Sequence, residues 1–195
     1  MPDDLFQEPD NATPLTPEER AELIPAHIAF RAELNEAEQE NITRGQDWAL
    51  ARKRDLLNEK FIKDLHGQML GDVWRWAGKF RTTERNLGIR YFEIPVAVRQ
   101  LLEDAKAWVQ YNTYPPDEIA VRFHHRLVQI HPFPNGNGRH SRLMADLLVM
   151  SPGGERFTWG SARLQPAGDV RRRYIEALQA ADNHDYGPLL RFARS

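Results

Sequence analysis

The residues best suited to chemistry lie together at 131–142, in the run His-Pro-Phe-Pro-Asn-Gly-Asn-Gly-Arg-His-Ser-Arg. An imidazole titrates near neutral pH, so His131 can accept a proton from a hydroxyl group. Gly136 and Gly138 allow backbone angles that other residues avoid, so the N–H groups around Asn137 can converge on one anion. A base beside an anion cradle predicts the transfer of a nucleotidyl or phosphoryl group.

Two helices are expected to position this loop. Apolar residues recur with a helical period from Asp117 to Ile130, and the prolines at 132 and 134 end that helix with His131 at its C-terminal end. A second helix is expected from Arg139 onward, and its N-terminus adds partial positive charge to the loop. Arg139 and Arg142, at i and i+3, can both face the loop, so a polyphosphate is the expected occupant.

Each feature has a simpler explanation when it is taken alone. A histidine at a helix end is commonly a capping or core residue, paired glycines commonly form a turn, and Arg142 could pair with Asp146 at i+4. Together, at this spacing, the features favour a phosphate site. A zinc site formed by His124, His125 and His131 is disfavoured because no i+4 His or Glu pair accompanies them.

The run resembles the signature of the Fic (Fido) family, His-x-Phe-x-Asp/Glu-Gly-Asn-Gly-Arg-x-x-Arg, and departs from it at Asn135, where the family has an acid. The whole chain is similar to the bacterial subfamily known as mobile mystery protein B, which pairs the loop with segments like Leu65-His66 and 74–78. The resemblance implies a mainly α fold, a Fic-type helical bundle with one small β-hairpin. It also implies transfer of AMP from ATP to a Ser, Thr or Tyr hydroxyl of a target protein.

The resemblance further implies a role for each matching residue. His131 would be the general base that takes the hydroxyl proton, and Phe133 would anchor the loop by packing. The α- and β-phosphates of ATP would be held by Gly136, Asn137 and Gly138. Phosphate would also be contacted by Arg139, and the γ-phosphate by Arg142, which fits charge stabilisation at a transferring phosphoryl group.

Asn135 affects how strongly the protein could hold a metal ion. In the family the acid at this position holds the Mg²⁺ that bridges the phosphates, and a neutral amide oxygen is a weaker ligand for a hard cation such as Mg²⁺ or Mn²⁺. Three outcomes stay open: an ion held mainly by ATP, slow or metal-altered transfer, or a changed donor. Alternatives to the adenylyltransferase are a non-enzymatic nucleotide-binding regulator, and a Fic enzyme that uses another donor or removes AMP. The intact His131 favours transfer, because binding alone needs no base.

A second part of the resemblance lies in the helix expected at 26–41. Glu40-Asn41 partly matches the inhibitory motif Ser/Thr-x-x-x-Glu-Gly/Asn, with Glu36 at the Ser/Thr position. The match implies an ion pair between Glu40 and Arg142 that keeps the arginine from the terminal phosphate of ATP. The alternative is a solvated acidic face, because Glu38 is also acidic.

A β-hairpin is expected at 80–94, because Asn86-Leu87-Gly88 is a turn signal between two stretches that contain Thr, Ile, Tyr and Phe. In Fic proteins a hairpin at this place, the flap, aligns the target's segment by main-chain hydrogen bonds. Arg85, Asn86, Leu87 and Gly88 are therefore the candidate docking residues. A hairpin that serves only packing is the alternative.

The length of 195 residues fits one domain, expected at 16–195 after a flexible lead at 1–15. The run 16–19, Thr-Pro-Glu-Glu, predicts a short helix through an N-cap and a capping box. Further helices are expected at 48–69 after a break at Gly45, from Pro95, from Asp169 and around 189–192.

The composition of the chain indicates which classes of partner to expect. The formal charge of −2 gives no global argument for nucleic acid or an anionic membrane, and no apolar stretch approaches the length of a membrane span. The absence of cysteine excludes disulfides and thiolate metal sites and fits a reducing compartment. We expect a cytoplasmic protein whose partners are ATP and a target protein, and a homo-oligomer remains open.

Overall fold

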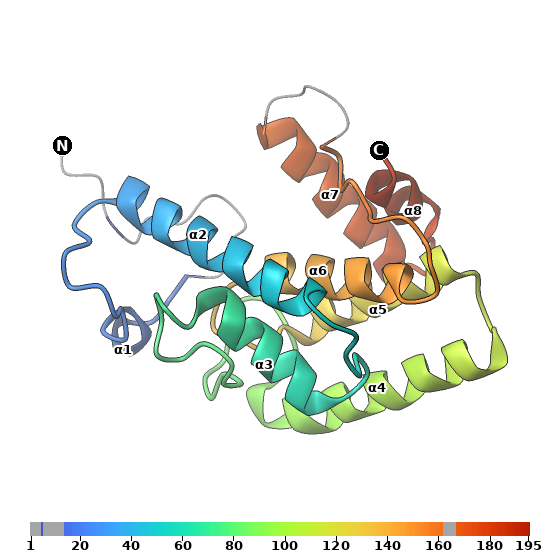
Figure 1. The fold of residues 1–195 in the computed structure, drawn as a ribbon, viewed down its shortest axis with the longest axis horizontal. Helices are drawn as coiled ribbons and strands as arrows, with labels where there is room; N and C mark the ends of the chain where they lie inside the picture. The colour runs from blue at the N-terminus through green and yellow to red at the C-terminus, as the bar shows by residue number, and fades with distance from the viewer. Residues whose placement is uncertain (1–4, 6–13, 162–166) are drawn as a thin grey trace.

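The computed structural model describes residues 5, 14–161 and 167–195, and the regular secondary structure of the described chain is helical apart from one isolated β-bridge (Figure 1). The helices are α1 (Pro17–Arg20), α2 (Arg31–Leu50), α3 (Glu59–Leu70), the 3-10 helix η1 (Tyr91–Glu93), α4 (Ile94–Tyr111), α5 (Pro116–Ile130), α6 (Asn137–Met150), α7 (Ala167–Asp182) and α8 (Gly187–Ala193). No helix in the described ranges is both long and apolar enough to cross a membrane.

The centre of the fold is the antiparallel pair of α5 and α6, joined by the loop 131–136 (Figure 1). The α2–α3 pair packs against α6, α4 packs along α5, and α8 joins α7 to α5. Phe123 and Ile130 of α5 and Met144 and Val149 of α6 are fully buried. The loop between these helices is therefore held at both ends by elements that are fixed in the core.

Local sequence signals set several helix ends as expected. The Thr16 side chain accepts a hydrogen bond from the Glu19 amide, and the Glu19 carboxylate accepts one from the Thr16 amide, so the predicted capping box is formed. The Asn58 side chain accepts from the Phe61 amide at 2.8 Å and so caps α3. α5 ends where the backbone of His131 turns left-handed, at φ 53°.

The N-terminal helices differ from the predicted ones. The helix expected at 26–41 is α2, which runs from Arg31 to Leu50 straight through Gly45, so the predicted break there is wrong. A Cβ at Gly45 would lie 2.8 Å from the Met69 Cα, so this glycine permits close approach of α2 and α3. The helix expected at 48–69 is instead interrupted at 51–58, where the Arg54 guanidinium donates to the Trp48 carbonyl at 2.6 Å.

The β-hairpin predicted at 80–94 is not formed. Residues 79–90 contain no strand and 91–93 form η1, while the described chain has one isolated β-bridge, between Leu23 and Trp74. Arg81 gathers this segment instead: its guanidinium donates to the carbonyls of His131, Thr83 and Ile89. The carbonyls of Thr83 and Ile89 are thus bonded to a side chain and not to a neighbouring strand. Of the lead predicted at 1–15, residues 1–4 and 6–13 lie outside the described chain.

Candidate functional site

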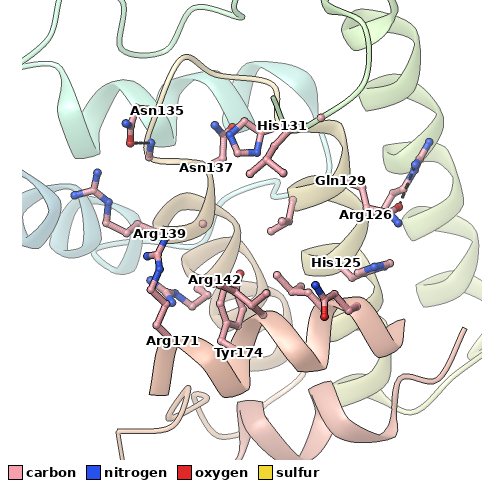
Figure 2. A pocket seen from close by; sticks show the side chains of 18 of the residues that line it. His125, Arg126, Gln129, His131, Asn135, Asn137, Arg139, Arg142, Arg171 and Tyr174 are labelled. Carbon is pink, nitrogen blue, oxygen red and sulfur yellow. Dashed lines mark hydrogen bonds between the residues drawn. The ribbon is translucent and has the colours of Figure 1, made fainter. Parts of the chain in front are cut away.

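A cavity of about 1010 Å³ opens over the loop between α5 and α6. Its walls come from the loop and the start of α6, from the C-terminal half of α5, from α7, from α2, and from the segment 87–89. Figure 2 shows the labelled side chains around it, with His131 near the loop and Arg139, Arg142 and Arg171 along one side. The predicted base and both predicted arginines thus line one cavity.

His131 sits where α5 gives way to the loop, and its own backbone carbonyl is fixed by the Arg81 Nε at 2.7 Å. Gly88 packs directly on it, since a Cβ at Gly88 would lie 2.6 Å from the His131 Cβ. Burial, and then the nearby charge of Arg81, lower the pKa of His131 to about 4. The imidazole is therefore neutral near pH 7 and able to accept a proton.

Asn137 and Phe133 close the loop on itself. The Phe133 amide donates to the Asn137 Oδ1 at 2.9 Å, and the Asn137 Nδ2 donates to the Phe133 carbonyl at 2.8 Å. Both polar groups of the Asn137 side chain are thus occupied within the protein, in contrast to the expected phosphate contact. The Phe133 ring is fully buried. This pair defines the loop shape, and a ligand would meet backbone groups there.

The two glycines of the motif, Gly136 and Gly138, differ in their surroundings. Gly136 is the N-cap of α6 with φ 77°, and a Cβ there would lie 2.5 Å from the Leu70 Cδ1. Gly138 lies in the first turn of α6, where a Cβ would have the Tyr174 hydroxyl at 4.0 Å. Since the first turn of a helix offers unpaired N–H groups and a partial positive charge, this end of α6 suits an anion.

Arg139 is engaged by an acid from α2. Its Nη1 lies 2.7 Å from the Glu38 Oε2, and the second carboxylate oxygen of Glu38 accepts from the Trp74 Nε1 at 2.8 Å. The Glu38 side chain is 9% exposed and that of Arg139 is 34% exposed. Arg142 is held differently, with its guanidinium carbon 5.4 Å from the centre of the Tyr174 ring.

The expected pair between Glu40 and Arg142 is not formed. Glu40 is 66% exposed, and its partner is Arg44, one turn along the same helix, at 3.9 Å. The buried positions of α2 are Leu34, Glu38, Asn41, Gly45 and Ala49. This spacing of three and four residues places Glu38 on the inner face and Glu40 outside. The same period, read from the sequence, could have identified Glu38.

Asn135 does not build a metal site. Its Oδ1 accepts a hydrogen bond from the Gly136 amide at 2.6 Å (Figure 2). No group of three or more His, Cys, Asp or Glu side chains in the described chain is arranged to hold an ion. The cavity carboxylates, Glu38 and Asp182, are taken by Arg139 and by His125 with Gln129. A hard divalent cation prefers carboxylate oxygens, so these donors do not fit a protein-held Mg²⁺ or Mn²⁺.

The candidate docking residues at 85–88 point in different directions. The Arg85 side chain is 4% exposed and forms an ion pair with Glu19 of α1, so it faces the protein. Asn86, Leu87 and Gly88 are exposed, and Leu87 and Gly88 also line the cavity. The exposed apolar residues nearest in sequence are Tyr91, Phe92 and Val96.

One wall of the cavity is formed by α7. Arg171 lines the cavity together with Tyr174 and Ile175. The Tyr174 hydroxyl lies 3.1 Å from the His124 Nε2, and burial raises the pKa of Tyr174 to about 12. Tyr174 packs against the core and also lines the cavity, which the helix expected from Asp169 did not by itself indicate.

Comparisons with known proteins agree with this geometry. The sequence profile of the Fic/DOC family matches residues 56–149. "Protein adenylyltransferase Fic" of Aedes aegypti is 31% identical over 147 residues, which are 73% of this chain and 28% of that protein. "Protein adenylyltransferase fic-1" of Caenorhabditis elegans is 30% identical over 148 residues, again 73% and 28%. The chain thus spans little more than a quarter of the length of these curated relatives.

The fold is shared with solved structures. BepC, an effector protein of Bartonella tribocorum solved with bound AMPPNP, has a TM-score of 0.70 at 16% identity, over 92% of this chain and 97% of that one. A Fic domain containing signalling protein from Bacteroides thetaiotaomicron has a TM-score of 0.62 at 21% identity, over 82% and 66%. The signature loop, the helices that hold it and these matches agree: the chain belongs to the Fic/DOC family.

Proposed function

We propose that this protein is an adenylyltransferase that transfers AMP from ATP to a hydroxyl side chain of a target protein. The observation that carries the proposal is the neutral imidazole of His131 at a cavity that is also lined by Gly136 and by the start of α6. The relatives named as adenylyltransferases support it, as does the AMPPNP bound to the structurally similar BepC.

In this reaction the hydroxyl oxygen of the target attacks the α-phosphorus of ATP. His131 takes the hydroxyl proton, the new O–P bond forms, and the bond between the α-phosphorus and its bridging oxygen breaks to release pyrophosphate. The α6 N-terminus and the backbone around Gly136 stabilise the negative charge of the phosphates. Arg142 lies on the next turn of α6, where it would contact the terminal phosphate.

ATP is the proposed donor, and Mg²⁺ or Mn²⁺ would reach the site as the ion that ATP itself carries. With no carboxylate at position 135, neutralisation of phosphate charge falls mainly to the guanidinium groups around the cavity. Arg142 and Arg171 supply two of them. An arginine presents several donors in a fixed plane, which suits phosphate oxygens.

The target protein is proposed to dock along Asn86, Leu87 and Gly88, which are exposed beside His131. This segment can bring a target hydroxyl to the imidazole because Gly88 packs on the His131 side chain. It would act through its exposed backbone and the Leu87 side chain. Arg85 instead anchors the segment to α1.

We propose that Glu38 restrains the enzyme and so has the inhibitory role that was expected of Glu40. Its carboxylate holds Arg139 through a charge-assisted bond, and Trp74 holds the carboxylate in place. An arginine that is bound to an acid is less available to a phosphate. The restraint would act on Arg139, the first arginine of the motif.

The proposal is tested with ATP labelled at the α-phosphate, incubated with the protein and a cell lysate. We expect label on protein with wild type and with His27→Ala, an exposed histidine away from the site, and none with His131→Ala. A parallel assay with label at the γ-phosphate separates nucleotidyl from phosphoryl transfer. Equal labelling by His131→Ala and wild type would refute the enzyme.

The second candidate is a nucleotide-binding regulator without transfer activity, favoured by the amide at Asn135 and by the Glu38–Arg139 pair. ATP binding without label transfer, in both wild type and Glu38→Gln, would support it. Label transfer that appears in Glu38→Gln would instead identify a restrained enzyme.

A further inference from the structure

A buried histidine lies directly beneath the signature loop. His66 of α3 is 0% exposed, and its ring stacks on Phe133 with the ring centres 3.7 Å apart and an interplanar angle of 17°. Both ring nitrogens have backbone partners. The Gly78 amide donates to the Nδ1 at 3.0 Å, and the Nε2 lies 3.0 Å from the Asn135 carbonyl oxygen.

These partners determine the tautomer of His66. A backbone amide only donates, so the Nδ1 must be the unprotonated nitrogen that accepts from Gly78. A carbonyl oxygen only accepts, so the Nε2 must carry the hydrogen and donate to Asn135. A proton on the Nδ1 would oppose the Gly78 amide. Burial, followed by the nearby His140, lowers the pKa of His66 well below its ordinary value, so this neutral form is retained.

The bond to His66 also sets the direction of the next amide. A trans peptide points its C=O and N–H to opposite sides, and the described chain contains no cis peptide bond. The Asn135 carbonyl points to the buried side, so the Gly136 N–H points to the cavity. There it is covered by the Asn135 Oδ1 at 2.6 Å. That oxygen therefore occupies the acceptor position of this amide.

We infer that His66 is a positioning residue for the anion site: it holds the 135–136 peptide so that the Gly136 N–H faces the bound polyphosphate, and the Asn135 side chain covers this amide until the ligand arrives. The inference rests on the proposed nucleotide function. A fixed peptide matters here because Gly136, at φ 77°, has no side chain to oppose a flip of the peptide. Pre-oriented donors bind an anion without the cost of reorganisation.

His140 provides a matched control. It is also 0% exposed, and its ring meets the Phe133 ring edge-on with the ring centres 5.2 Å apart. Its Nε2 bonds to the Ile62 carbonyl at 3.0 Å, and its Nδ1 has no partner among the described residues. Replacing His140 therefore disturbs the same buried layer while leaving the Asn135 carbonyl bonded.

The test compares the wild type, His66→Phe, His66→Gln and His140→Phe. Phenylalanine keeps a stacking ring and removes both hydrogen bonds, while glutamine can still donate to the Asn135 carbonyl. We measure ATP affinity by calorimetry and thermal melting of the same samples. We expect ATP affinity to fall about tenfold in His66→Phe, to recover in part in His66→Gln and to stay near wild type in His140→Phe. Equal affinity in a folded His66→Phe would overturn the inference.

A second measurement does not depend on nucleotide. Nitrogen-15 NMR of the imidazoles reports the tautomer, and we expect His66 to keep its hydrogen on the Nε2 from pH 5 to pH 8. A hydrogen on the Nδ1, or a titration near the ordinary histidine pKa, would overturn the inference even if His66→Phe does not fold. A wild-type protein that binds no ATP would overturn the proposed function. The NMR measurement of the tautomer would still test whether His66 holds the 135–136 peptide in this orientation.

Discussion

Replacing Glu38 with glutamine should increase the affinity for ATP. In the wild type one oxygen of Glu38 accepts from Trp74 and the other binds Arg139 at 2.7 Å. Glutamine can keep its carbonyl oxygen on Trp74, which leaves its NH₂ group opposite the guanidinium. Two donors then face one another, so Arg139 is released toward the cavity with no loss of the packing around Trp74.

The size of the effect follows from the exposure of the pair. A hydrogen bond to a charged group contributes about 1.5–3 kcal/mol when it is buried, and an exposed ion pair contributes about 0–1 kcal/mol. Glu38 is 9% exposed but Arg139 is 34% exposed, so solvent screens one partner. We therefore expect about 1–2 kcal/mol, which corresponds to roughly five- to thirtyfold tighter ATP binding.

Glu40→Gln is the matched control, because Glu40 lies on the same helix, is 66% exposed and pairs only weakly with Arg44. Titration calorimetry with ATP measures both variants against the wild type, and thermal melting checks the fold. We expect no change in affinity with Glu40→Gln. Unchanged affinity with Glu38→Gln, or a gain with Glu40→Gln, would refute the assignment of the restraint to Glu38.

The remaining predictions concern pH and metal. The pKa of His131 is lowered to about 4, so its neutral, basic form persists down to that pH. We therefore expect kcat/KM to be constant between pH 5 and pH 8. A loss of kcat/KM below about pH 6.5 would contradict the burial of the base. Asn135→Asp should introduce a carboxylate beside the phosphates and tighten Mn²⁺ binding in the presence of a non-hydrolysable ATP analogue, as followed by electron paramagnetic resonance. Equal Mn²⁺ affinity in the two proteins would show that position 135 does not reach the ion.

Local chemistry in the sequence was enough to predict several elements. The capping box at Thr16 and Glu19 formed as expected, because its donors and acceptors all lie within one turn. The helices on both sides of the signature loop were also predicted, since the apolar period and the prolines at 132 and 134 act locally. α6 begins two residues earlier than expected because Gly136 supplies its N-cap.

Long-range contacts account for the failures. Gly45 was interpreted as a break, yet it is the point where α2 rests on the backbone of Met69, which its neighbours in sequence do not reveal. The segment at 80–94 has the composition of a hairpin, but Arg81 binds its carbonyls and the His131 carbonyl with one side chain. A propensity for strands cannot predict a competing donor that lies across the fold.

In the candidate site, too, some residues could be predicted from local sequence and others depend on long-range packing. The motif alone predicted the base and the two arginines that line the cavity. The positions of Glu38, His66 and Tyr174 depend on how α2, α3 and α7 pack around the loop. Glu38 left a readable trace through its place in the inward-facing series with Leu34 and Asn41, and His66 left one through the segment Leu65-His66 that carries part of the resemblance.

The cavity is assembled from three separate parts of the chain, and this has a consequence for how such a protein can diversify. The stretch that matches the family, 56–149, carries the signature loop, while Glu38 on α2 and Arg171 and Tyr174 on α7 lie outside it. Under the proposed function, substitutions in α2 would change how readily the enzyme is switched on, and substitutions in α7 would change which molecule the opposite wall accepts. Control and selectivity can therefore be altered by exchanging the flanking helices, with the reactive centre left intact.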